Sequence, residues 1–135
     1  MFIDFSELPS TPHSRWTDLP DDEALLLWSV RRMVVAWPRC HAVHAALHRR
    51  FGDDALGVEH MLRCLLIGLA RHATRPLRLG DPACALLLPD EALLLLALRN
   101  SGDPARAGTA IEALSGAPAA ACLLPITVAL AALTS

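Results

Sequence analysis

The stretch Pro89-Asp90-Glu91-Ala92-Leu93-Leu94-Leu95-Leu96-Ala97-Leu98-Arg99-Asn100 decides the fold class of this chain. Proline suits the first turn of a helix, and the two acids that follow it complement the positive end of the helix dipole. Leucine and alanine, which are strong helix formers, fill the middle, and the glycine at position 102 is typical of a helix end. The stretch is therefore predicted to be a helix that ends between Asn100 and Gly102.

The same start and stop signals recur along the chain and predict further helices on both sides of this stretch. Upstream, three helices are expected, from near Pro20 to about Trp37, from Pro38 to Gly52, and from about Leu56 to His72. Downstream, one helix is expected from Asp103-Pro104 to Gly116 and a last one after Pro118 or Pro125. Asp18 is expected to cap the first of these helices, and Asp53 and Asp54 the third. Asp81 with Pro82 is expected to form another cap and first turn.

The apolar spacing agrees with these helices. Leu27, Val30, Val34 and Trp37 repeat at intervals of three and four residues, which places them on one buried face. No strand pattern and no internal repeat competes. The predicted fold is an all-α single-domain bundle of five to seven helices, residues 18–135, preceded by an extended arm, residues 1–17, with prolines and serines but no helical period.

The composition excludes several classes of partner. The 135 residues are 53% hydrophobic and 19% charged, with a mean hydropathy of +0.37, which favours a well-filled bundle or a surface that meets a partner. The formal net charge of -2 argues against a nucleic-acid binder. Acids near the first methionine are atypical of a signal peptide, and the four cysteines are scattered, so we expect a cytoplasmic protein with reduced thiols.

The uncharged stretch at residues 113–135 is long enough to span a bilayer. It contains Gly116, Pro118 and Pro125, is rich in alanine, and lacks flanking basic residues. These features favour a stretch that packs into the bundle or into a dimer interface over a membrane anchor.

The run from Cys40 to His48 is the strongest candidate for chemistry. Cys40, His44 and His48 are four residues apart and would form a ladder on one face of a helix, with His41 beside it. Imidazole and thiolate suit Zn²⁺, Ni²⁺, Cu²⁺ or iron. In a tight hairpin turned at Gly52, the next helix would supply Glu59, His60 and Cys64, with His48 facing Glu59 or His60, and His44 facing Cys64.

The helical period of the next helix favours a plainer interpretation, in which the histidines border a buried helix and no cofactor is bound. His60 lies nearly opposite the leucine face of its helix and should point to water.

Arginines occur in pairs and groups that could hold an anion but also suit helix C-termini. These are Arg31-Arg32, Arg49-Arg50, and Arg71 with Arg75 and Arg78.

A family resemblance covers residues 22–100. The segments Leu25-Leu26-Leu27-Trp28-Ser29-Val30-Arg31-Arg32-Met33, Phe51-Gly52, Pro76-Leu77-Arg78-Leu79-Gly80-Asp81-Pro82-Ala83-Cys84 and Asp90-Glu91-Ala92-Leu93-Leu94 resemble a family of short, uncharacterised, mostly alphaproteobacterial proteins. That family often has several cysteines near the position of Cys84, where this chain has one. The resemblance implies a small helical protein and implies no activity.

The chain has no motif of a known catalytic site, such as a P-loop or a nucleophile elbow. We therefore expect a non-enzymatic helical protein that acts by binding another protein or itself. The alternative is a transition-metal-binding protein that uses the Cys40, His44 and His48 face.

Overall fold

The computed structural model describes residues 15–116 and 120–134, and within them the all-α prediction is confirmed. The α-helices described are α1 (Asp21–Val35), α2 (His41–Phe51), α3 (Ala55–His72), α4 (Pro89–Arg99), α5 (Pro104–Ser115) and α6 (Ala120–Thr134). Two short 3-10 helices, η1 (Trp16–Asp18) and η2 (Gly52–Asp54), precede α1 and α3. Most of the arm expected at residues 1–17 lies outside the described residues.

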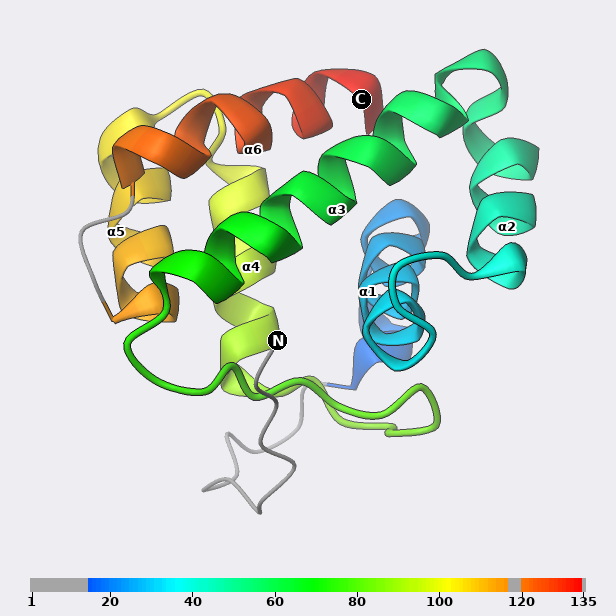
Figure 1. Cartoon of the computed structure of the whole chain (residues 1–135), viewed down its shortest axis with the longest axis horizontal. Coiled ribbons are helices and arrows are strands. Elements are labelled where there is room, and N and C mark those ends of the chain that lie inside the picture. The colour runs from blue at the N-terminus through cyan, green and yellow to red at the C-terminus, as the bar shows by residue number, and fades with distance from the viewer. Residues whose placement is uncertain (1–14, 117–119, 135) are drawn as a thin grey trace.

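The helices form three pairs that share one core (Figure 1). α3 and α6 pack along each other, α4 and α5 form a second closely packed pair, and α1 and α2 lie at the other end of α3. The core consists mainly of leucines from all these helices, including Leu27, Leu47, Leu62, Leu65, Leu66, Leu69, Leu95, Leu114 and Leu123. The long connection at residues 73–88 runs beneath the bundle to the end of α1 and returns to α4.

The part of the uncharged C-terminal stretch that the structure describes packs into the bundle. Leu123, Thr127 and Leu130 of α6 are buried, and α6 contacts α3, α5 and α4. A Cβ at Gly68 of α3 would collide with the Leu123 side chain, so this glycine lets the two helices approach closely. Among the described residues, no helix is both long enough and apolar enough to cross a membrane.

The boundary between the first two helices differs from the prediction. α1 ends at Val35, and Trp37 lies beyond the helix with its side chain exposed, not on the buried face. The residue before a proline is disfavoured in the helical region, so Trp37 cannot easily continue the helix toward Pro38. α2 begins at His41 rather than Pro38, because Cys40 still has extended backbone angles.

None of the four expected aspartates caps a helix through its side chain, and Asp53 lies inside η2. Asp18 lies in η1, and Pro20 occupies the cap position of α1. Asp54 precedes α3, but its side chain makes no capping hydrogen bond. Asp81 accepts a hydrogen bond from the backbone N–H of Ala83 in a turn that no helix follows. By contrast, Asp103 caps α5 through the backbone N–H of Arg106, as the Asp-Pro pattern predicts.

Candidate functional site

Among the predicted metal ligands on α3, Glu59 meets α2, whereas His60 and Cys64 contact each other. Nδ1 of His44 on α2 lies 3.0 Å from Oε2 of Glu59 on α3. The expected hairpin register was therefore wrong: His44 meets Glu59 rather than Cys64. The chain reverses at Gly52, where η2 begins, and His44 and Glu59 lie eight and seven positions on either side of this glycine, whereas Cys64 lies twelve positions after it. Local spacing could place these residues on their helices but could not fix the connection between them.

Glu59 is the polar centre of the α2–α3 contact. Its side chain is only 6% exposed, while His44 is 45% exposed. The second carboxylate oxygen, Oε1, accepts a hydrogen bond of 2.8 Å from Nη1 of Arg63, one turn further along α3. Burial raises the pKa of Glu59, but the hydrogen bonds with His44 and Arg63 outweigh it and bring this pKa below its usual value. Glu59 is therefore held as a carboxylate.

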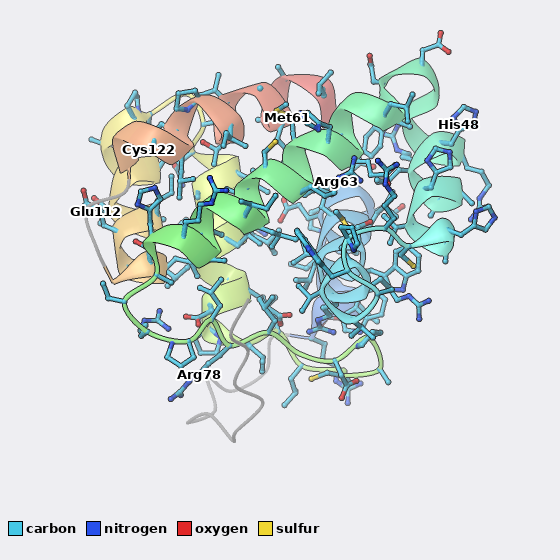
Figure 2. All side chains as sticks on the ribbon, in the orientation of Figure 1. His48, Met61, Arg63, Arg78, Glu112 and Cys122 are labelled. Atoms are coloured by element: carbon cyan, nitrogen blue, oxygen red, sulfur yellow. The ribbon has the colours of Figure 1, made fainter. Side chains whose placement is uncertain are left out.

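The other two histidines of α2 are exposed. The rings of His44 and His48 are stacked, with centroids 6.3 Å apart and planes inclined by 17°. His48 lies at the outer edge of α2, and Arg63 lies on the side of α3 that faces α1 and α2 (Figure 2). His41, in the first turn of α2, is also exposed. The three histidines thus lie on the polar side of this helix, as predicted.

Cys40 is separated from the histidines by burial. It occupies the cap position before α2 and is 6% exposed, and Nη2 of Arg32 lies 3.6 Å from its sulfur. Burial raises the pKa of the thiol, but backbone N–H groups of Val43 and Ala42 and the Arg32 guanidinium together lower it below the usual value. A metal ion at this sulfur would have to displace Arg32.

The remaining predicted ligands lie together but apart from α2. Sγ of Cys64 is 3.6 Å from Nε2 of His60, one turn away on α3. His60 is exposed, as its position on the helix predicts. Within residues 15–116 and 120–134, no three histidine, cysteine or acidic side chains gather closely enough to hold a metal ion. The complete ligand set expected from the sequence is therefore not assembled.

A second candidate site is an apolar groove between α4 and α5. Its volume is about 480 Å³, and its lining consists of Leu93, Leu96, Asn100, Ala105, Arg106, Thr109, Ala110 and Ala113. Leu96 is 43% exposed there. The sequence carries a signal for this groove that the helix prediction did not use. The run of leucines from Leu93 to Leu96 is too wide for one buried face, so part of it must face outward.

The charged residues that meet in the interior were not predicted as partners. Nε and Nη2 of Arg31 on α1 donate to the two carboxylate oxygens of Glu91 on α4, at 2.7 and 2.8 Å. Arg31 also donates to the carbonyls of Cys84 and Leu86 in the long connection. Neither an anionic ligand nor a helix C-terminus accounts for Arg31. The signal was its position four residues after Leu27, on the apolar face of α1.

A second arginine binds the neighbouring acid. Arg75 donates through Nη1 and Nη2 to the two carboxylate oxygens of Asp90, at 2.9 and 2.8 Å, and through Nη2 to the carbonyl of Ala113 on α5. Asp90 also accepts a hydrogen bond from the backbone N–H of Arg78. The adjacent acids at the start of α4 therefore fasten the long connection to the bundle, in addition to complementing the helix dipole.

Comparison of the chain with family models, with curated proteins and with solved structures finds no significant match. The resemblance to a family of short helical proteins stays a prediction.

Proposed function

We propose that this protein is a non-enzymatic cytoplasmic module that associates with a second copy of itself through the α4–α5 groove, without nucleic acid or membrane. The observation that carries this proposal is the apolar lining of the groove, with Leu96 43% exposed at a surface that faces water. Large apolar side chains that line an exposed hollow are typical of a surface that another protein covers.

The side chains of the groove suit a close helix-to-helix contact. The α5 side of the groove is lined by small residues that leave room for a neighbouring helix, namely Ala105, Ala110 and Ala113. Leu93 and Leu96 stand on the α4 wall, three residues apart on one face. Leu96 of each copy would enter the hollow beside the alanines of the other copy, which is the usual arrangement of a large side chain in a pocket at an interface.

The charges beside the groove favour a second copy of the chain over a partner whose contact surface carries charges of only one sign. Asp103 and Arg106 lie at the start of α5, with Nε of Arg106 3.5 Å from Oδ2 of Asp103, and both are exposed. In a dimer with two-fold symmetry the same patch meets itself, so each charge finds its opposite on the other copy. A patch with both signs satisfies this requirement, whereas a uniformly charged patch would repel itself.

Sedimentation equilibrium of the full chain tests the proposal. The wild type is expected to be a dimer in the micromolar range, and Leu96→Glu is expected to be a monomer because a charge would be buried at the interface. Leu56→Glu is the matched control, since Leu56 is 67% exposed but lies on α3 away from the groove. This control should remain a dimer.

A charge reversal sharpens the test. Arg106→Asp should weaken the dimer, because two like charges would then meet across the two-fold axis, and Arg106→Lys should retain it, because it keeps the charge and leaves the Asp103 cap of α5 intact. A monomeric wild type, or a dimer that Leu96→Glu leaves intact, would refute the proposal. The second result would assign the interface to another surface.

A further inference from the structure

The polar side of α2 carries a pair of histidines, His44 and His48, and a buried carboxylate contacts the first of them. His44 and His48 are one turn apart, both reach the surface, and their rings are stacked with centroids 6.3 Å apart. Histidines at this spacing can direct one nitrogen each toward a common point beside the helix. The HExxH motif of metalloproteases uses the same spacing on one helix to bind zinc.

The contact with Glu59 fixes the chemistry of one ring. Glu59 accepts a hydrogen bond from the permanently charged Arg63, which holds it as a carboxylate and therefore as an acceptor only. The proton of the neutral His44 ring must then lie on Nδ1, which faces Glu59 at 3.0 Å. Nε2 of His44 consequently keeps its lone pair. A neutral imidazole with a free lone pair on one nitrogen is the form that binds metal ions.

This arrangement is the one that supports metal-binding histidines in proteins. Such histidines usually donate their second ring N–H to a carboxylate or carbonyl, which fixes the ring orientation and makes the ligand nitrogen more basic. Glu59 is 6% exposed and is held from the other side by Arg63, so it is a rigid support for a ring that is itself accessible. The support comes from α3, whereas the two ligands come from α2.

We propose that His44 and His48 form a chelating site for a borderline divalent transition metal ion, Ni²⁺, Cu²⁺ or Zn²⁺, with Nε2 of His44 as one donor and Glu59 as its supporting carboxylate. The site supplies two protein ligands and leaves the other coordination positions to water. Cys40 is not a ligand, because Arg32 lies against its buried sulfur. Nitrogen ligands alone favour these ions over Mg²⁺ and Ca²⁺, which prefer oxygen.

Isothermal titration of the tag-free full chain with Ni²⁺ at neutral pH tests this site, since Ni²⁺ suits imidazole and does not oxidise thiols as Cu²⁺ does. One ion per chain is expected, and His44→Ala and His48→Ala should each weaken binding by at least about tenfold, as loss of one of two ligands does. Glu59→Gln should weaken it by about tenfold without removing a ligand.

The chain offers two matched controls. His72→Ala removes an exposed histidine at the end of α3, and Cys64→Ser removes the sulfur beside His60. Both should keep the affinity of the wild type. Binding that His44→Ala and His48→Ala leave within twofold, or that Cys64→Ser removes, would overturn the proposal. Circular dichroism of each variant confirms that the helices are retained, so a lost affinity is read as a lost ligand.

Discussion

Ion pairs at the start of α4 and on α2 contain the same kinds of groups, but those at α4 are buried and those on α2 are exposed. At α4, Arg31 and Glu91 are 1% and 0% exposed. Glu91 also accepts from the backbone N–H groups of Gly80 and Leu88, at 3.1 and 2.9 Å. At α2, Arg50 and Asp22 make an equally short two-pronged contact, but they are 54% and 32% exposed.

This difference separates groups that maintain the fold from groups available to a ligand. Inside the protein a charge without a partner is costly, so Arg31 and Glu91 must stay together whatever else binds. On the α2 side, His44 uses one nitrogen for Glu59 and keeps the other for solvent. We call Arg31 and Glu91 the closed cluster, and it fastens the long connection to the bundle. We call His44, Glu59 and Arg63 the open cluster, and it is where we place the metal site.

The largest expected effect comes from breaking the closed cluster. Arg31→Met should lower the free energy of unfolding by about 3–5 kcal/mol, because Glu91 would remain as an uncompensated buried charge. Urea denaturation followed by tryptophan fluorescence measures it. The double variant Arg31→Met with Glu91→Gln should recover part of the loss. A cost below about 1 kcal/mol for Arg31→Met would show that water or a rearranged loop reaches Glu91.

The second effect concerns the space around the closed cluster. A Cβ at Gly80 would lie 2.9 Å from Cζ and from Nη2 of Arg31. Gly80→Ala should therefore displace the buried guanidinium and cost about 1–3 kcal/mol. Gly102→Ala is the matched control, because nothing lies within 4 Å of a Cβ there. Thermal unfolding of both variants distinguishes them, and equal melting temperatures would contradict the close approach.

The third effect is a pH dependence at the open cluster. The contacts with His44 and Arg63 lower the pKa of Glu59 in the folded state. The stability that these two contacts give the folded protein is therefore fully present above the ordinary glutamate pKa of about 4.3. It is lost as pH falls through the lower pKa that Glu59 has in the folded protein. Glu59→Gln should cost about 1 kcal/mol at neutral pH and progressively less in acid. Parallel stability curves for wild type and variant across that range would contradict this assignment.

The smallest effect is expected at the exposed pair. Arg50→Ala should lower the free energy of unfolding by only about 0.2–1 kcal/mol, although its contacts with Asp22 are as short as those between Arg31 and Glu91. The loss should shrink further in high salt, which screens exposed charges. Urea denaturation at two salt concentrations measures both. A cost comparable to that of Arg31→Met would mean that geometry, rather than burial, sets the strength of these pairs.

The helices were predictable because their signals are local. Pro89 with Asp90 and Glu91, and Asp103 with Pro104, mark helix starts within four residues of sequence, and the structure begins α4 and α5 at those prolines. The boundary near Trp37 was missed because the apolar spacing continued past the point at which Pro38 disfavours helix. The position of His60 on the exposed side of α3 followed from the helical period alone.

The sequence by itself determined the helical class, the starts of α4 and α5 at Pro89 and Pro104, and the histidine side of α2, since each depends on neighbours within one or two turns. Only the tertiary structure decided which charges meet. Arg31 and Glu91 are 60 residues apart in the chain, and His44 and Glu59 are joined through a 3-10 turn whose register no local pattern fixes. Such contacts depend on how whole helices pack, and packing is set by the summed shape and burial of many side chains rather than by spacing along one of them.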